Sequence, residues 1–294
     1  MRGEQLTIIL MCYNEREYIA KTIENILRLK PDNSKLIVGD NSSKDGTDAI
    51  ICEYLSGRTD VKLIMRNKNI GGLENFNDLC KNVETKYLIF ASAHDLWGEN
   101  YLEVLLSHIE KTPECAIAYA PTTWIDQSGN NLDYASSELP TTGLNATKSF
   151  IAISIANQHY LNGIIRTEWL KSTRLNLPIL GSYEIWLQEL ATFGDFDLVS
   201  GTTWFRRQNR EPKNRLQILQ RYQKSLFGDT GNAQRFKFAP GMQYLMSYLF
   251  LPIFMQNLNL KQRMSLFREA LFIFLRKFPS MLKNDFVYML SQIR

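Results

Sequence analysis

The residues LTIILMCYNE, Leu6–Glu15, begin with a short, mostly apolar run and end in a polar turn. Such a run with a turn directly behind it is typical of a buried strand. The next segment, Glu15–Leu29, repeats apolar side chains at helical spacing, and Lys35–Val38 is a second buried run. Strand, helix and strand in this order predict the first unit of an α/β sheet.

The same alternation continues to about residue 90. Helical patterns over Asp45–Leu55 and Leu73–Val83 alternate with strand-like runs at Val61–Met65 and Tyr87–Phe90. We therefore predict an α/β fold with a mixed, mostly parallel sheet that helices cover on both faces. Later helical patterns cover Tyr101–Ile109, Lys148–Asn157, Glu168–Ser172 and Glu184–Phe193, and later strand-like runs cover Ala116–Tyr119, Thr122–Ile125, Phe196–Val199 and Thr203–Phe205.

Polar residues gather where the first four predicted strands end. Asn14 and Glu15 follow the first strand, Asp40 the second, Asn69–Gly72 the third and His94-Asp95 the fourth. Ligands of parallel α/β sheets bind beyond the carboxyl ends of the strands. These four turns therefore predict one binding site at that edge of the sheet.

Four segments carry a family resemblance: Tyr13–Glu15, Asp40–Thr47, Asn69–Asn77 and Ala93–Leu102. Together they resemble the family 2 inverting glycosyltransferases with the GT-A fold. That family typically shows a Tyr-Asn-Glu turn, an Asp-Asp/Asn-x-Ser-x-Asp-Gly-Thr segment, an Asn-x-Gly loop and an Asp-x-Asp-Asp motif. The resemblance covers residues 5–105 well and 155–210 loosely.

The resemblance implies transfer of a sugar from a UDP- or dTDP-linked donor to a saccharide acceptor, lipid-linked in our expectation, during assembly of a surface polysaccharide or oligosaccharide. It implies that Asp40 accepts hydrogen bonds from the base or ribose. Asn69, Gly71 and Gly72 allow a close approach of the loop backbone to the ligand, because glycine has no side chain to obstruct it. The expected nucleotide-sugar site comprises Cys12, Tyr13, Asn14, Glu15, Asp40, Asn69, Gly71, Gly72, Asn77, Ser92, Ala93, Arg206 and Arg207.

The metal motif departs from the family pattern. The family's Asp-x-Asp binds a divalent cation at the diphosphate, whereas the aligned residues here are Ser92, Ala93 and His94, followed by Asp95. A His/Asp pair tolerates Mn²⁺ better than the harder Mg²⁺. His94, with or without Asp95, is our first candidate for the metal ligand. A direct contact of protonated His94 with the phosphates and a loss of metal binding are the alternatives.

Inverting transfer also needs a carboxylate base on the acceptor side. The family places this base at the start of a helix, which here corresponds to Gly181–Gly194. Glu184 is the expected catalytic base and Glu189 the reserve; the alternative is that Glu184 only favours the helix N-terminus. The following strand matches the place where family members often carry basic or His residues that meet the diphosphate. The resemblance therefore implies that Arg206 or Arg207 does so here, and strand alternation turns the other one away.

Charge divides the chain into two parts. Residues 201–294 carry 16 Lys/Arg against 4 Asp/Glu, whereas residues 1–200 carry 18 against 26. We assign residues 1–211 to the GT-A domain and residues 212–294 to a helical, basic C-terminal region. Met264–Phe278 combines basic and large apolar residues, which suits an anionic membrane surface. A subdomain packed on the catalytic domain and a homodimer contact are the alternatives, and no nucleic-acid-binding module is recognised.

The cysteines and the apolar segments indicate the cellular compartment in which we expect the protein. The four cysteines show no CxxC pairing, which fits a reducing compartment. The first apolar run is too short for a signal sequence, and Met242–Leu258 falls short of a membrane span. We expect a cytoplasmic protein, peripheral on the inner face of a bacterial plasma membrane. The competing hypothesis is a non-catalytic nucleotide-sugar-binding or scaffold protein of the same fold.

Overall fold

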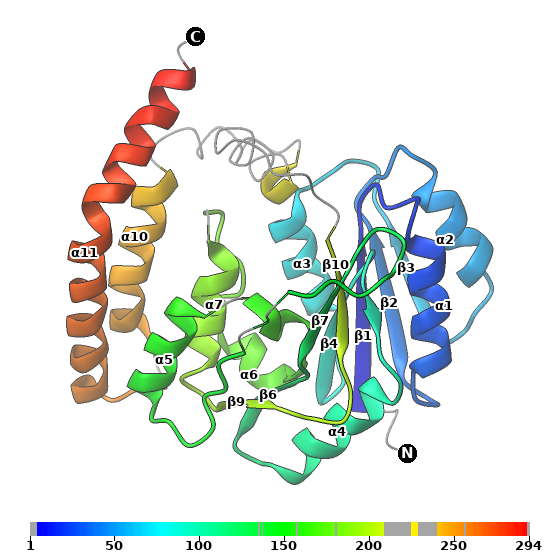
Figure 1. Ribbon diagram of the computed structural model, residues 1–294, viewed down its shortest axis with the longest axis horizontal. Helices are drawn as coiled ribbons and strands as arrows, with labels where there is room; N and C mark the ends of the chain where they lie inside the picture. Colours follow the sequence, from blue (N-terminus) through cyan, green and yellow to red (C-terminus); the bar gives the residue numbers. More distant parts are fainter. Residues whose placement is uncertain are drawn as a thin grey trace.

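A seven-stranded sheet forms the centre of the protein. The computed structural model describes residues 5–134, 136, 138–156, 158–179, 181–208, 225–228, 240–255 and 257–292. Within these ranges the main sheet has the order β3-β2-β1-β4-β8-β6-β9 (Figure 1). Its parallel half consists of the four predicted strands, β1 (Leu6–Cys12), β2 (Lys35–Asp40), β3 (Val61–Met65) and β4 (Tyr87–Ser92).

The second half of the sheet contains one antiparallel strand. β8 (Ile164–Arg166) lies between β4 and β6 (Cys115–Tyr119) and runs antiparallel to both. β9 (Asp195–Leu198) then pairs parallel with β6. The sheet is therefore mixed but mostly parallel, as predicted.

Helices cover both faces of this sheet, which explains why its central strands are largely apolar. Along β1, Leu6, Ile8 and Leu10 pack into one buried cluster and Ile9 into another. The first cluster lies under α1 (Ile19–Leu29), α2 (Thr47–Leu55) and α4 (Tyr101–Lys111). The second lies under α3 (Gly72–Lys81), α6 (Thr167–Ser172) and α7 (Ser182–Leu190).

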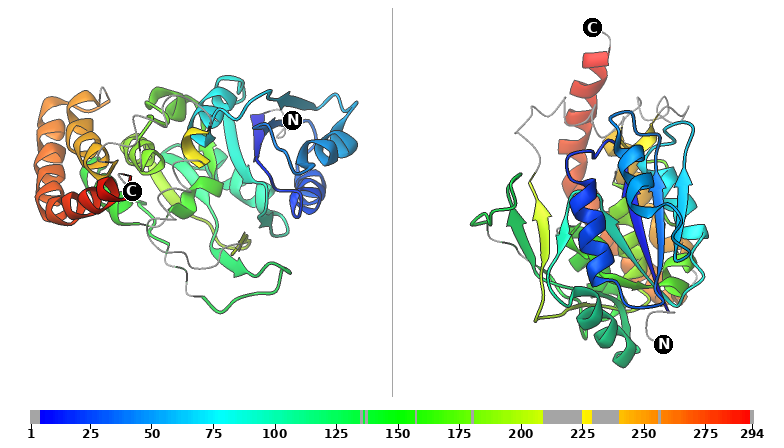
Figure 2. Two further views of the ribbon diagram at one scale, coloured as in Figure 1. Left: turned by 90° about the horizontal axis from the view of Figure 1, so that it is seen from above. Right: turned by 90° about the vertical axis from the view of Figure 1, so that its right-hand side faces the viewer.

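A small second sheet brings a late segment of the chain to the end of β4. Its order is β5-β10-β7, with β5 at Leu96–Trp97, β7 at Thr122–Ile125 and β10 at Trp204–Arg207. β10 runs antiparallel to β5 and parallel to β7. Figure 2 (right) shows β7 and β10 beside the main sheet. Because β5 follows directly on the β4 turn, this pairing carries Arg206 and Arg207 to the predicted site.

The C-terminal helices pack against the far end of the α/β domain. α10 (Pro240–Phe250), the short η3 (Leu251–Phe254) and α11 (Leu260–Gln292) lie at the opposite end from α1 and α2 (Figures 1 and 2). They share a buried cluster with α5 (Ala146–Ile155) and α7, in which Phe150 and Ile185 meet Tyr248 and Leu266. Residues 240–255 and 257–292 are largely helical, as predicted, and the proposed boundary at residue 211 lies outside the described residues.

Asp285 of α11 ties the two long helices together. Its side chain is 4% exposed, and its two carboxylate oxygens accept hydrogen bonds from the backbone nitrogens of Gly241 and Met242, each at 2.8 Å. A carboxylate at a helix N-terminus satisfies amides that have no partner within the helix. Among the described helices, none combines the length and the apolar character that a membrane crossing requires.

Candidate functional site

Strand register places the predicted polar turns at one edge of the sheet. Cys12 of β1 pairs with Asp40 of β2, and Met11 pairs with Ser92 of β4. Since these strands are parallel, the turns that follow them lie side by side. The three segments around Glu15, Asp40 and His94 are thus brought together, as predicted.

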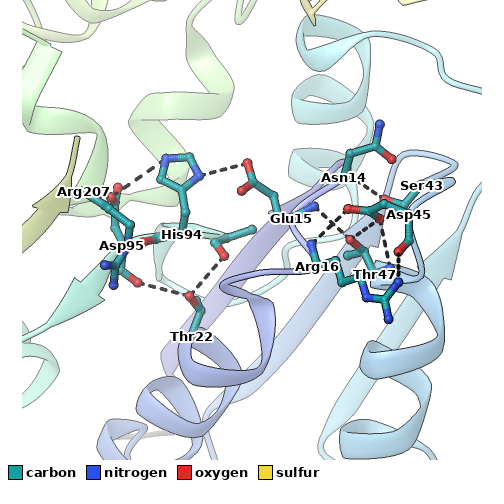
Figure 3. Close-up of polar contacts among 11 residues, drawn as sticks. Asn14, Glu15, Arg16, Thr22, Ser43, Asp45, Thr47, His94, Asp95 and Arg207 are labelled. Carbon is teal, nitrogen blue, oxygen red and sulfur yellow. Dashed lines mark hydrogen bonds and ion pairs between the residues drawn. The ribbon is translucent and has the colours of Figure 1, made fainter. Parts of the chain in front are cut away.

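The turn after β1 is fixed by the segment after β2 (Figure 3). The Asn14 backbone nitrogen donates to Ser43 Oγ at 2.9 Å, and Asn14 Oδ1 accepts from the Lys44 nitrogen at 2.8 Å. The Glu15 nitrogen donates to Thr47 Oγ1 at 2.8 Å. Asn14 has φ of 55°, a left-handed conformation that asparagine tolerates better than most residues. These bonds orient the Glu15 side chain toward β4.

His94 lies between two carboxylates (Figure 3). Its Nδ1 is 2.9 Å from Glu15 Oε1, and its Nε2 is 3.9 Å from Asp95 Oδ1. The side chains of His94 and Glu15 are 24% and 23% exposed, whereas that of Asp95 is 5% exposed. Asp95 Oδ1 also accepts a hydrogen bond from the Arg207 backbone nitrogen at 2.8 Å. An imidazole at the end of β4 is therefore oriented by a carboxylate from the end of β1.

The two neighbouring arginines of β10 have different surroundings. Arg207 is buried: its Nε donates to the His94 carbonyl at 2.9 Å, and its Nη1 donates to the carbonyls of Asp126 and Gln127, each at 2.8 Å. Arg206 stacks on two indoles, 4.7 Å from the ring centroid of Trp124 and 5.2 Å from that of Trp204. Arg207 therefore supports the β4 turn, and Arg206 is the arginine that lines a cavity.

That cavity has a volume of about 270 Å³ and lies beside β4. Its apolar side chains include Phe76, Phe90 and Trp204. Its polar side chains include Glu15, His94, Tyr183 and Arg206. Of the predicted residues, it is lined by Glu15, Ser92, Ala93, His94, Asp95 and Arg206. An apolar pocket with a few convergent polar groups is the usual form of a small-molecule site.

Asp40 and Asn69 organise the turns beside this cavity. Asp40 is 2% exposed, and its carboxylate accepts hydrogen bonds from both the backbone nitrogen and the hydroxyl of Ser43. Asn69 Oδ1 accepts from the Asn41 side chain and from the Gly71 backbone nitrogen, each at 2.8 Å. Both side chains thus bind the chain's own polar groups.

The glycines of the Asn69–Gly72 loop face a segment that lies far away in the sequence. Gly71 has φ of 84°, and a Cβ atom there would lie 2.4 Å from the Leu226 carbonyl oxygen. A Cβ on Gly72 would lie 3.2 Å from the Ser225 carbonyl oxygen. The glycines thus admit a close backbone approach, and the approaching backbone is that of residues 225–228. The predicted approach of this loop to a ligand stays a prediction.

The remaining predicted donor-site residues lie outside this cavity. Asn77 exchanges two hydrogen bonds with the backbone of Asn176, at 2.8 and 2.9 Å. Cys12 is buried, and burial, followed by the charges of Asp40 and Glu15, raises the pKa of its thiol. Tyr13 is half-buried in the turn after β1.

The candidate base and its reserve both lie on α7. Glu184 is in the first turn, where its carboxylate is near Gly181 and interacts with the hydroxyl of Tyr244 on α10. Burial and then Glu184 raise the pKa of that hydroxyl. Glu189 accepts from the Arg174 side chain at 2.6 Å and from its backbone nitrogen at 2.9 Å. Neither glutamate lines the cavity, and Glu189 has a structural partner.

His94 and Asp95, the predicted metal ligands, lie together at the end of β4, with His94 Nε2 3.9 Å from Asp95 Oδ1. One imidazole nitrogen and a carboxylate suit Mn²⁺ better than Mg²⁺, which prefers oxygen ligands alone. This pair therefore fits the cation that the family resemblance implies. Glu15 lies at Nδ1, on the other side of the His94 ring, where it orients the imidazole.

Several cavity residues escaped the sequence analysis. In the sequence, Phe76, Phe90 and Tyr183 have the pattern of ordinary core residues of a helix or strand. Tyr183 is in fact close to the core, because burial raises the pKa of its hydroxyl. Leu161 and Asn162 belong to a short 3₁₀ helix, η2 (Gln158–Asn162), which no local pattern indicated. What these cavity residues share is their position next to the end of β4, and this position can be recognised only in the folded chain.

Comparison with known sequences decides the family. Residues 7–172 match the profile described as Glycosyl transferase family 2. The chain belongs to glycosyl transferase family 2. This confirms the predicted family, and the matched range contains β1 to β4 with Glu15, Asp40 and His94.

Two curated members illustrate the range of the family. The glucosyltransferase WfgD of Escherichia coli, named UDP-Glc:alpha-D-GlcNAc-diphosphoundecaprenol beta-1,3-glucosyltransferase, is 27% identical over 106 residues, which are 36% of this chain and 41% of that protein. The poly-beta-1,6-N-acetyl-D-glucosamine synthase of Staphylococcus epidermidis is 24% identical over 111 residues, 38% of this chain and 27% of that protein. The chain thus matches less than half the length of either relative.

A solved structure shows the same fold. TarS 1-349 of S. aureus, crystallised in complex with UDP-GlcNAc, superposes with a TM-score of 0.56 at 13% identity, covering 92% of this chain and 81% of that chain. The predicted GT-A fold is therefore confirmed.

Proposed function

We propose that this protein transfers a sugar from a UDP- or dTDP-linked donor to a saccharide acceptor in surface polysaccharide or oligosaccharide assembly. The observation that carries the proposal is the cavity at the end of β4, where Glu15, His94 and Arg206 converge in a family 2 fold. The names of WfgD and of the TarS complex, which mention UDP-Glc and UDP-GlcNAc, support a UDP-linked donor.

In this proposal the diphosphate of the donor binds between Arg206 and His94. The Arg206 guanidinium can donate two parallel hydrogen bonds to phosphate oxygens, and stacking on Trp124 and Trp204 restricts its orientation. Glu15 orients the His94 ring through Nδ1. A divalent cation held by His94 and Asp95 would neutralise charge on the departing nucleotide diphosphate.

Transfer is proposed to occur by a single displacement with inversion. The acceptor oxygen forms a bond to the anomeric carbon, the bond from that carbon to the diphosphate breaks, and the acceptor proton passes to a carboxylate. Glu184 is the proposed base. Its place in the first turn of α7, directly after the cavity residue Tyr183, supports this role.

A panel of UDP- and dTDP-sugars incubated with diphosphate-lipid-linked saccharides tests the proposal, with product detected by mass spectrometry. Donor-dependent extension of one acceptor, lost in Arg206→Met and kept in Arg28→Met, is the expected result. Arg28 is a suitable control because it is half-exposed and pairs with Glu99 outside the cavity. Extension that Arg206→Met leaves unchanged would contradict the proposed donor site.

Binding of a nucleotide sugar without transfer is the second candidate function. The interaction of Glu184 with Tyr244, outside the cavity, favours it. The two candidates differ in one result: a binding protein takes up the donor in the same assay but forms no product with any acceptor.

We further propose that the C-terminal helices hold the protein on an anionic membrane surface. On α11 most of the exposed apolar side chains recur at helical spacing and form one stripe, which consists of Leu260, Met264, Leu271, Leu275 and Leu282; Phe272 is also exposed and lies beside this stripe. Exposed basic side chains follow alongside at Lys261, Arg268, Arg276 and Lys283. Burial of the stripe among lipid chains and attraction of the cations to anionic headgroups would act together.

Co-sedimentation with lipid vesicles tests this membrane contact. The wild-type protein should pellet with vesicles containing phosphatidylglycerol and much less with pure phosphatidylcholine. Leu271→Glu with Leu275→Glu should abolish pelleting, whereas Leu139→Glu, at an exposed apolar residue away from α11, should not. Equal pelleting of the double variant would refute the stripe as the contact. With the C-terminal helices on the membrane, a lipid-linked acceptor would reach the active site from that same membrane surface.

A further inference from the structure

A second group of possible metal ligands lies away from the nucleotide-sugar site. It consists of His108 in the last turn of α4, Cys115 at the start of β6 and Asp197 in β9. One ligand atom from each residue lies within 4.8 Å of the others. Because β6 runs parallel to β4, its amino end lies at the opposite edge of the sheet from His94. The group is therefore separate from the cavity described above.

We propose that His108, Cys115 and Asp197 bind one zinc ion. Thiolate sulfur, imidazole nitrogen and carboxylate oxygen are the three ligand types that zinc accepts in proteins. Mg²⁺ and Ca²⁺ would be poorly served by the sulfur and the nitrogen. The mixed donor set thus selects zinc over the cations that an oxygen cluster would attract.

The burial of the three side chains suits a zinc ion with three protein ligands and one water molecule. Cys115 is fully buried, and the Asp197 side chain is 6% exposed. The His108 side chain is 33% exposed, which leaves a route from solvent on that side. Tetrahedral zinc with three protein ligands commonly completes its shell with water. The open side at His108 can supply that fourth ligand.

The backbone around the three ligands is already fixed. Thr142 Oγ1 donates to Asp197 Oδ1 at 2.6 Å, which leaves Oδ2 directed at His108 Nε2, 2.8 Å away. Arg166 holds the turn between His108 and Cys115: it donates to the carbonyls of Ile109, Thr112 and Cys115, each at 2.8 Å. Hydrogen bonds of this kind, made to the ligand side chains and to the backbone beside them, orient metal ligands before the ion arrives.

Only small side-chain movements separate this arrangement from a zinc site. Ligand atoms at about 2.0–2.3 Å from zinc lie roughly 3.3–3.8 Å apart in a tetrahedron. His108 Nε2 and Asp197 Oδ2 would separate slightly, and the Cys115 sulfur would move toward both. As zinc binds, two protons leave the ligand atoms: the Cys115 thiol proton passes to solvent, and the proton between His108 Nε2 and Asp197 Oδ2 passes to solvent while Nδ1 of the neutral ring carries the remaining proton. No group changes oxidation state.

Cobalt substitution tests the site on the full-length protein. After chelation and removal of the chelator, one equivalent of Co²⁺ should produce a thiolate-to-cobalt charge-transfer band, and Zn²⁺ should bleach it at one equivalent. Cys115→Ser should abolish the band. His108→Gln and Asp197→Asn should weaken Zn²⁺ binding at least tenfold in competition with a chromophoric chelator. Cys80→Ser and His94→Gln are the controls that should keep the band, because both residues lie elsewhere in the fold.

The cobalt spectra can overturn the proposal in two ways. One is the absence of any charge-transfer band in the wild-type protein. The other is a band that persists in Cys115→Ser or disappears in Cys80→Ser. Because Cys115 is fully buried and its variant could unfold, circular dichroism accompanies each spectrum, and His108→Gln provides the decisive variant if Cys115→Ser is unfolded. Zn²⁺ affinity equal to wild type in a folded His108→Gln protein would refute the site.

Discussion

Neighbouring arginines of β10 should respond to the same substitution in opposite ways. Arg207→Met removes three hydrogen bonds from a side chain that is 6% exposed and its stacking on Tyr18, whose ring centroid is 4.8 Å away. The His94 carbonyl loses a charged donor, whereas the Asp126 carbonyl keeps a bond from the Gly129 nitrogen and Gln127 is exposed to water. An orphaned buried acceptor costs about 1–3 kcal/mol and a cation–π contact about 0.5–2 kcal/mol. We expect Arg207→Met to lower the free energy of unfolding by about 2–4 kcal/mol.

Arg206→Met should instead spare stability and weaken ligand binding. The Arg206 side chain stacks on Trp124 and Trp204, and a methionine thioether can also pack against indole rings. We expect a loss of less than about 1 kcal/mol in the free energy of unfolding. A lost pair of charged hydrogen bonds to phosphate is worth about 1.5–3 kcal/mol, which corresponds to a roughly 10- to 100-fold weaker Kd for UDP.

Urea unfolding and calorimetric titration of UDP measure the two effects separately. The titrations are carried out at a temperature at which both variants are folded, because loss of Arg207 weakens the turn that carries His94. Arg28→Met, on an exposed part of α1, serves as the matched control for loss of one positive charge. Equal destabilisation by the two substitutions, or unchanged UDP affinity in Arg206→Met, would refute the assignment of roles.

Three further perturbations test other parts of the account. Glu184→Gln should abolish sugar transfer, while the Kd for UDP changes less than about threefold. Its companion variant Tyr244→Phe should lower the unfolding temperature but retain transfer. If both variants retain transfer, Glu184 is not the base. Gly71→Ala should lower the free energy of unfolding by about 1–3 kcal/mol, measured by urea denaturation, because φ of 84° with ψ of 155° is strained for alanine and its Cβ would clash with Leu226; unchanged stability would contradict the packing of residues 225–228 on this loop. Hydrogen bonds from Arg58 and Lys30 lower the pKa of Asp60 from 3.8 to about 2. Ionised Asp60 therefore stabilises the fold above the unfolded pKa, and this contribution is lost as the pH falls through the folded value, so Asp60→Asn should show a smaller drop in unfolding temperature than wild type between about pH 5 and about pH 2.5. An equal drop in both proteins would exclude Asp60 as a source of acid sensitivity.

The parallel half of the fold could be predicted because its information is local. β3 was predicted at the observed residues Val61–Met65, and β1, β2 and β4 differ from the prediction only at their carboxyl ends. Each is a short apolar run between helices with a clear apolar stripe. The insertion of β8 between β4 and β6 could not be predicted, since a three-residue antiparallel strand depends on partners far away in the sequence.

The sequence predicted which residues gather at the candidate site, but not which way their side chains point. Turn composition indicated that Glu15 and His94 lie near one edge of the sheet, and the family resemblance implied that Arg206 or Arg207 joins them there. Alternation along β10 implied that one of two arginines turns away, yet only the pairing with β5 and β7 decides that Arg207 is the buried one. The Asn69–Gly72 loop illustrates the same limit: its glycines predicted a close approach to a ligand, whereas the structure also packs them against a segment more than a hundred residues later.

Calorimetric titration of UDP and dTDP into the full-length protein, with Mn²⁺ and after chelation, tests the central claim most directly. The account predicts saturable binding of one nucleotide diphosphate per chain, weakened at least tenfold by chelation and by His94→Gln, and unaffected by Arg28→Met. Absence of binding by both nucleotides under all conditions would contradict the claim that the cavity beside β4 is a nucleotide-sugar site.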